Sequence, residues 1–307
     1  MRPSPLPPCC ATNGARGLSS LRTLLLAFIL TGLLCSPSFA QKAVHLMPAA
    51  DSPAIGPALQ SDLPASHGSN DIAQAWLSTS QTRISHGALG DVPETSVLTV
   101  RTRGGAMLSY ALPDDSVFED LIPRVHDLNG DGHDEVILVR SRLHTGSSLM
   151  LLGIRAGKLM PLAESVPLDQ PGQWLNPVGV ADVDGDGRME ILVVLTPHSN
   201  GTLIEYNLVE GTLVQGHLIS GVTNHVMGSR DQGMSALMDA NGDGHPDVIV
   251  PATDRRSIHA LAFDEKAPLE FSRIYLPARA AGNFEMLPPA TLIVPLEDGR
   301  RMVIEWR

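Results

Sequence analysis

The stretch DVDGDGRMEILVVL, residues 182–195, decides the fold of this 307-residue chain. Its first nine residues place carboxylates at alternate positions around two glycines, which is the arrangement of a calcium-binding turn. Calcium prefers hard oxygen ligands, whereas zinc prefers sulfur and nitrogen. The turn runs directly into apolar, β-branched residues that favour a strand. An EF-hand loop instead closes with a glutamate at position 12 and leads into a helix, and position 12 here is Val193.

The same pattern occurs three times in the chain. The related stretches DLNGDGHDEVILV and DANGDGHPDVIV begin at residues 127 and 239. One such turn could be a solvated acidic loop, but three in the same arrangement favour metal binding. We expect ligands from the side chains at positions 1, 3, 5 and 9 and from the main-chain carbonyl at position 7. The predicted calcium ligands are Asp127, Asn129, Asp131, His133 and Glu135; Asp182, Asp184, Asp186, Arg188 and Glu190; and Asp239, Asn241, Asp243, His245 and Asp247.

The three turns are 55 and 57 residues apart, which is a spacing typical of propellers and solenoids. Within each period the sequence predicts four strands, including hairpins that turn at Ala156-Gly157 and Glu210-Gly211. Four strands per period correspond to one propeller blade.

Two degenerate copies flank the three turns, at residues 87–101 and 294–306, and both lack the ligand pattern. We therefore predict an all-β fold, a β-propeller of four-stranded blades, with about five blades including the degenerate ones. A ring must close, and we expect residues 302–306 to pair with residues 72–77 in a shared blade.

These residues resemble the FG-GAP repeats, also described as VCBS repeats, which build the calcium-binding propeller at the N-terminus of integrin α chains and occur in many bacterial surface and secreted proteins. The resemblance covers residues 113–275 and rests on the calcium motif and the blade-length period. The phenylalanine-glycine and glycine-alanine-proline signatures of the family are absent, and only Val178-Gly179-Val180 echoes them. The resemblance implies a propeller with structural Ca²⁺ in its loops.

The N-terminal residues predict export. Arginines precede a short apolar run, and Ser38-Phe39-Ala40 supplies the small residues that a signal peptidase reads, so we expect residues 1–40 to be a signal peptide cleaved after Ala40. Residues 41–70 are rich in Ala, Pro and Ser and predict a flexible linker, which leaves residues 71–307 for the propeller domain. The expected location is periplasmic or secreted, without a membrane-spanning segment.

A second candidate site precedes the calcium turns. Counting eight residues back from successive turns reaches connections that gather on the opposite face of a propeller, where ligands usually bind. The candidate binding residues there are Trp174, Asn176, His225, Arg230 and Asp231. The alternative is that Trp174 fills the space between two blades.

The predicted function is a calcium-stabilised module that binds a protein or a glycan. The net charge of −11 lacks the basic footprint of a nucleic-acid groove. No catalytic motif appears, so no catalytic residue is nominated. A secreted polysaccharide lyase or hydrolase on the same scaffold and a scaffold without a small ligand remain the alternatives, because fold analogy does not separate them.

Overall fold

The computed structural model describes residues 43–48, 65–84, 86–90, 94–264 and 267–306. All regular elements of these residues are β-strands, so the predicted all-β class is confirmed. No helix in this part of the chain is long and apolar enough to cross a membrane. The predicted signal peptide, residues 1–40, lies outside the described residues.

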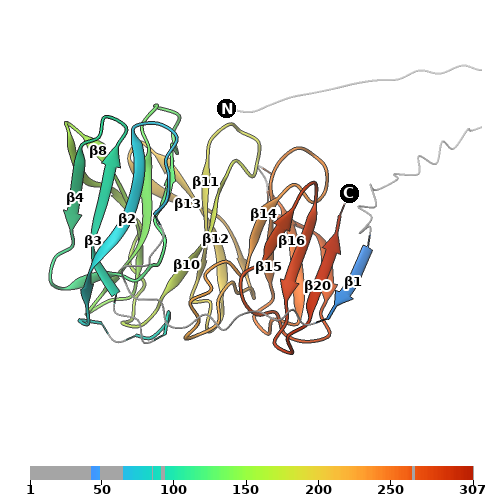
Figure 1. Ribbon diagram of the computed structural model, residues 1–307. Coiled ribbons are helices and arrows are strands. Elements are labelled where there is room, and N and C mark those ends of the chain that lie inside the picture. Colours follow the sequence, from blue (N-terminus) through green and yellow to red (C-terminus); the bar gives the residue numbers. More distant parts are fainter. Residues whose placement is uncertain (1–42, 49–64, 85, 91–93, 265–266, 307) are drawn as a thin grey trace, which may run out of the picture. The chain divides into compact units, whose positions relative to one another are not determined.

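The strands form antiparallel sheets, each built mainly from consecutive strands (Figure 1). The first sheet contains β2 (Ile72–Gln81), β3 (Glu94–Thr102), β4 (Met107–Ala111), β5 (Ser116–Phe118), β6 (Arg124–His126), β7 (Glu135–Arg142), β8 (Ser148–Arg155) and β9 (Lys158–Glu164). The second contains β10 (Leu175–Ala181), β11 (Glu190–Leu195), β12 (Thr202–Val209) and β13 (Thr212–Ser220). The third contains β14 (Ala236–Met238), β15 (Asp247–Pro251), β16 (Ser257–Ala262) and β17 (Leu269–Tyr275). The fourth contains β18 (Glu285–Leu287), β19 (Thr291–Pro295), β20 (Arg301–Glu305) and β1 (Ala43–Met47).

The predicted hairpin turns are confirmed. Ala156 and Gly157, between β8 and β9, have φ values of 52° and 74°. Glu210 and Gly211, between β12 and β13, have φ values of 49° and 76°. Two consecutive residues with positive φ give a tight turn whose twist matches that of the flanking strands.

The pairing of the last strand differs from the prediction. β20 pairs with β1, where Ala43 lies opposite Glu305, whereas Ile72 of β2 lies opposite Thr102 of β3. The expected linker 41–70 therefore contains a strand of the fourth sheet. The sequence did not reveal it because an edge strand of five residues is held mainly by main-chain hydrogen bonds, which leave no compositional trace.

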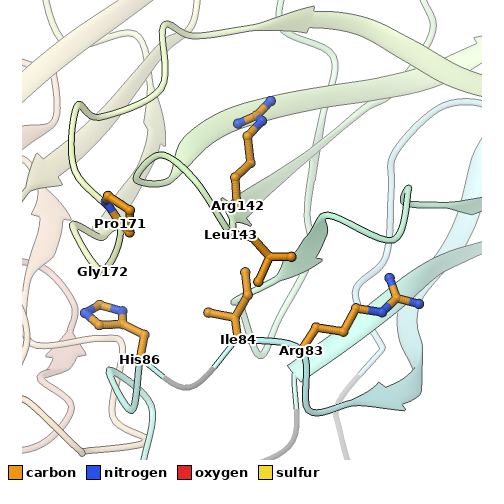
Figure 2. Close-up of a pocket in the computed structure, with 7 residues that line it drawn as sticks. All are labelled: Arg83, Ile84, His86, Arg142, Leu143, Pro171 and Gly172. Atoms are coloured by element: carbon orange, nitrogen blue, oxygen red, sulfur yellow. The ribbon is translucent and has the colours of Figure 1, made fainter.

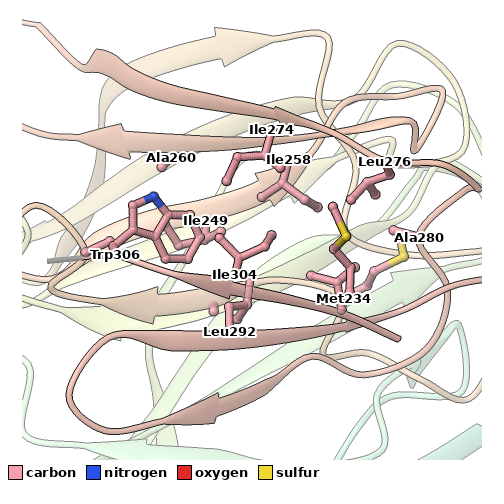
Figure 3. Close-up of a cluster of buried hydrophobic side chains, with 14 of the residues drawn as sticks. Met234, Ile249, Ile258, Ala260, Ile274, Leu276, Ala280, Leu292, Ile304 and Trp306 are labelled. Carbon is pink, nitrogen blue, oxygen red and sulfur yellow. The ribbon is translucent and has the colours of Figure 1, made fainter. Parts of the chain in front are cut away.

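The core lies between neighbouring sheets. Residues 191–194 of β11 are all 0% exposed, since Ile191 and Val193 pack against the first sheet and Leu192 and Val194 pack against the third. A strand buried on both faces reads as a continuous apolar run rather than an alternating one. The third and fourth sheets share a further cluster around Ile249 and Ile304 (Figure 3).

Candidate functional site

The three acidic turns connect β6 to β7, β10 to β11 and β14 to β15. In each turn the ninth residue is the first residue of the following strand: Glu135, Glu190 and Asp247. These three carboxylates are buried although the turns themselves are exposed. A carboxylate at this position is therefore fixed by a buried strand and aimed at an exposed loop.

The middle turn wraps around the carboxylate of Asp182. This side chain accepts hydrogen bonds from the main-chain nitrogens of Gly185 at 2.8 Å and Gly187 at 3.0 Å. The two glycines have φ values of 77° and 88°, a backbone conformation that other residues adopt only at a cost. The glycines at these two positions are thus needed to fold the chain around the predicted ligand.

Three carboxylates converge in the middle turn. Asp182, Asp184 and Glu190 each offer one oxygen, and these oxygens lie within 4.8 Å of one another. Glu190 Oε2 accepts a hydrogen bond from the Val183 nitrogen at 3.0 Å, whereas the buried Oε1 has no hydrogen-bond partner among the described residues. Burial raises the pKa of Glu190 to about 7, and the charge of Asp184 adds to the effect. An unpartnered buried oxygen among carboxylates is unfavourable unless a cation binds there, so the donor set fits a hard cation such as Ca²⁺.

Part of the negative charge of the first turn is paired with an arginine side chain. Arg155 Nη2 lies 3.4 Å from Asp131 Oδ2 and 3.4 Å from Glu135 Oε1. Asp127, at position 1, accepts hydrogen bonds from the main-chain nitrogens of Asp131 and Gly132. Asn129, at position 3, accepts from the same Asp131 nitrogen at 3.0 Å. The guanidinium of Arg155 therefore pairs with two of the predicted ligands.

In the third turn, the side-chain amide of an asparagine donates hydrogen bonds to two predicted ligands. Asn241 Nδ2 donates to Asp243 Oδ2 at 2.8 Å and to Asp247 Oδ1 at 3.2 Å. Asp239 accepts from the main-chain nitrogens of the two glycines, Gly242 and Gly244, as Asp182 does in the middle turn. Burial raises the pKa of Asp247 to about 7. Among the position-9 carboxylates of the three turns, Glu190 alone has a buried oxygen without a hydrogen-bond partner among the described residues.

The position-7 residues make main-chain and side-chain contacts of their own. Their main-chain nitrogens donate to the position-5 carboxylates Asp131, Asp186 and Asp243. The side chain of His133 contacts Asp71, and that of Arg188 pairs with Asp186. The ring of His245 packs over the middle turn, since a Cβ built on Gly185 would lie 2.5 Å from His245 Cε1. The second and third turns are therefore in contact.

Sequence reasoning missed a clamp on the first turn. The buried Asp134 carboxylate accepts hydrogen bonds from the main-chain nitrogens of Ser69, Asn70 and Ile72 at 2.9–3.2 Å. Asn70 Nδ2 in turn donates to Asp127 Oδ2 at 2.9 Å. The signal in the sequence is that position 8 is acidic in the first copy alone, since Met189 and Pro246 stand there in the others. Asp134 thus ties the start of β2 to a predicted calcium turn.

A groove lies at the other ends of β10 and β11. Trp174 precedes β10 and His198 follows β11, whereas the acidic turn joins the opposite ends of these strands. Three adjoining cavities of about 320, 230 and 260 Å³ form the groove. The first and second share His86 and Gly172, and the second and third share His198 and Met227. Figure 2 shows residues that line the first cavity, with His86 beside Gly172, and with Arg83 and Arg142 among the others.

Two of the predicted binding residues connect sheets. Trp174 is 1% exposed, and its Nε1 donates at 3.0 Å to the carbonyl oxygen of Glu119, which directly follows β5 of the first sheet. Asn176 is fully buried, and its Nδ2 donates to the carbonyl oxygens of Asn224 and Gln232. Gln232 Nε2 continues the network to Asp120 Oδ1 at 3.1 Å. This polar chain joins the first three sheets.

The other three predicted binding residues lie in the connection before β14. His225 is buried and contacts Trp174 edge-on, with ring centroids 4.8 Å apart. Asp231 accepts hydrogen bonds from Ser229 Oγ and Asn283 Nδ2. Arg230 has a buried Nη1 without a partner among the described residues. The structure therefore brings His225 and Trp174 together, while Asp231 bonds toward the fourth sheet.

Two histidines that the sequence did not nominate line the groove. His86 Nδ1 is 2.9 Å from Glu119 Oε1, and this hydrogen bond raises the pKa of His86. His198 stacks on Trp174, and its Nε2 is 2.7 Å from His225 Nδ1. Burial lowers the pKa of both His198 and His225 to about 4, so both rings are neutral near pH 7.

Comparison with known proteins finds a family match that includes the first two acidic turns. Residues 127–193 match the model of the FG-GAP-like repeat, and the match begins at the first acidic turn and includes the second. No curated protein matches the chain. The resemblance noted in the sequence is thus confirmed over these residues, and the chain contains an FG-GAP-like repeat there.

Proposed function

We propose that the chain is a calcium-stabilised β-propeller that acts outside the cytoplasm as a module for binding a protein or a carbohydrate. The FG-GAP-like repeat suggests a propeller-like binding module, and the antiparallel four-stranded sheets are compatible with blades. The N-terminal residues 1–40 support export as a signal peptide.

The observation that carries the metal proposal is the buried, unpartnered Oε1 of Glu190. It belongs to a set of three carboxylates whose oxygens lie within 4.8 Å of one another. Calcium coordination would satisfy this oxygen and offset the repulsion among the three charges. In each of the three turns, the residues at positions 1, 3, 5, 7 and 9 would supply the ligands.

The proposed partner site is the connection that carries His225, Arg230 and Asp231. Trp174 and Asn176 support it, because both bond across sheets beneath the groove. Arg230 is half-buried and contributes a guanidinium, a group that recognises carboxylates, to this connection.

Equilibrium dialysis against calcium tests the metal proposal directly. The expected result is up to three ions per chain, with dissociation constants of about 10⁻⁴ to 10⁻³ M, as in extracellular calcium modules. Asp184→Ala should remove one ion, whereas Asp169→Ala, outside the turns, should remove none. Identical ion counts in the two variants would refute the assignment of the middle turn.

Partner binding is tested with the calcium-loaded protein immobilised and exposed to glycans and to envelope proteins. Capture should weaken in Asp231→Asn while the melting temperature stays within a degree or two of the parent protein. Capture that follows only the folded fraction would contradict a binding role for this connection.

A further inference from the structure

The middle cavity of the groove, of about 230 Å³, has an unusual set of side chains. It is lined by two imidazoles, His86 and His198, and by the thioether of Met227. No carboxylate is among the described residues that line it. This cavity therefore lacks the carboxylates of the acidic turns and contains the imidazole and thioether groups that softer metal ions prefer.

Hydrogen bonding fixes which nitrogen of His198 carries the proton. His225 Nε2 lies 3.1 Å from the Ser229 carbonyl oxygen, and a carbonyl only accepts, so this nitrogen donates. In a neutral ring the other nitrogen, His225 Nδ1, must then accept, so His198 Nε2 donates to it across 2.7 Å. His198 Nδ1 is left with a lone pair and has no hydrogen-bond partner among the described residues. The relay thus presents His198 as a ligand through Nδ1.

His86 is oriented in a similar way by a buried carboxylate. Glu119 Oε1 accepts from His86 Nδ1 at 2.9 Å, and Ser141 Oγ donates to Glu119 Oε2 at 2.5 Å. His86 Nε2 faces Gly172, where a Cβ would lie 3.8 Å away, so the glycine leaves this edge of the ring uncovered. A carboxylate bound to one nitrogen of an imidazole is the arrangement that orients metal-ligating histidines and raises their basicity.

Met227 supplies the third donor. Its side chain is 52% exposed although it is large and apolar. It lines both the cavity with His86 and the neighbouring cavity with His198 and His225. A thioether is a poor ligand for calcium and zinc, whereas it favours Cu(I).

We propose that His86 Nε2, His198 Nδ1 and Met227 Sδ form a copper site that binds Cu(I), separate from the calcium turns. The site lies at the opposite ends of β10 and β11 from the middle turn, and it does not depend on calcium chemistry. Trp174, which is buried beneath His198, contributes packing rather than a ligand.

The test is competition for Cu(I) between the protein and a chromophoric Cu(I) chelator, under reducing conditions in millimolar calcium. Cys9, Cys10 and Cys35 are replaced by serine in every sample, because thiolates bind Cu(I) strongly. The expected result is one Cu(I) per chain. X-ray absorption should then show both sulfur and nitrogen donors.

Variants separate a built site from general copper binding. Met227→Leu should weaken Cu(I) binding by about tenfold or more, and His198→Gln at least as much. Met107→Leu on β4 is the matched control, since Met107 is 55% exposed and lines none of the three cavities; it should leave the affinity unchanged. Circular dichroism confirms that each variant is folded, and Met227→Leu, at an exposed position, is the variant expected to fold normally.

Three results would overturn the proposal. The first is a chain that retains no Cu(I) against the chelator. The second is an affinity that is the same in Met227→Leu and in the parent protein. The third is Zn(II) binding that is as tight as Cu(I) binding, with both affinities unchanged by Met227→Leu, because such a site would not use the thioether.

Discussion

Glu190→Gln should change stability in opposite ways with and without calcium. The substitution keeps an acceptor for the Val183 nitrogen and removes a buried negative charge from the middle turn. Its amide group would lie near Asp182 and Asp184, which are able to accept its hydrogens. In the metal-free variant the repulsion among the three acidic side chains is therefore reduced. The variant also lacks one of the predicted calcium ligands.

The magnitude without calcium follows from the pKa of Glu190. The pKa rises from 4.5 to about 7, and one unit corresponds to about 1.36 kcal/mol, so the charged side chain costs at most about 3 kcal/mol. Screening around the exposed turn reduces this to about 1–3 kcal/mol. The folded protein holds the proton more tightly than the unfolded chain, so the cost appears as the pH rises from 4.5 through 7. At pH 8 in chelator, the variant should be more stable than the parent by this amount.

The magnitude with calcium follows from ligand linkage. An ion present at about 100 times its dissociation constant adds about 2.7 kcal/mol to the free energy of unfolding. Glu190→Gln should lose most of the increment from the middle turn. The increments from the other two turns should remain.

The assay is urea denaturation at pH 8, in calcium and in chelator, for the parent and the variant. Glu135→Gln is the matched variant in the first turn, where Arg155 already pairs with the carboxylate. Its gain in chelator should be smaller than that of Glu190→Gln. A variant at Glu190 that loses stability in chelator, or keeps the whole calcium increment, would refute the reasoning.

Other outcomes follow from the clamp, the tryptophan and the histidines. Asp134→Ala should lower the free energy of unfolding by about 3 kcal/mol, both in calcium and in chelator, because three main-chain amides lose their acceptor. Asp134→Asn should cost less. A loss of stability that depends on calcium would contradict this role for Asp134. Trp174→Ala should cost about 3–5 kcal/mol by denaturation, and an unchanged stability would contradict its core position. Burial lowers the pKa values of His198 and His225 from 6.5 to about 4, so the unfolded chain binds protons at a higher pH than the folded protein does. The metal-free protein should therefore lose stability as the pH drops from about 6.5 to 4, by at most about 1.4 kcal/mol per pH unit for each ring. His198→Gln should reduce this pH dependence of the free energy of unfolding.

The sequence predicted the acidic turns and the strands that follow them because both signals are local. Ligand alternation fits within nine residues, and the run at 191–195 is apolar because both faces of β11 are buried. Pairing of β1 with β20 joins residues about 260 positions apart and leaves no pattern in either segment. The same is true of Asp134, whose partners are 62–65 residues away.

The groove was only partly predictable for the same reason. Counting back from the turns located Trp174 and the connection at 225–231, since these positions recur with the repeat. The repeat pattern did not predict His86 or His198, and both line one cavity because the first and second sheets pack around Trp174. Periodicity in the sequence therefore locates the residues that every repeat shares, whereas a site formed between two repeats can be recognised only when the packing of the sheets is known.

β10 and β11 connect the two candidate sites. With about 3.3 Å per residue, the six residues of β11 place the acidic turn and the His198 loop roughly 20 Å apart. At that distance calcium does not touch the groove, and residues 191–194 are rigidly packed on both sides. Calcium should therefore affect the groove only through the folded fraction: below the unfolding transition, chelation should leave Cu(I) affinity unchanged. A change in copper affinity on calcium removal, in protein that remains folded, would mean that β10 or β11 shifts when the middle turn is emptied.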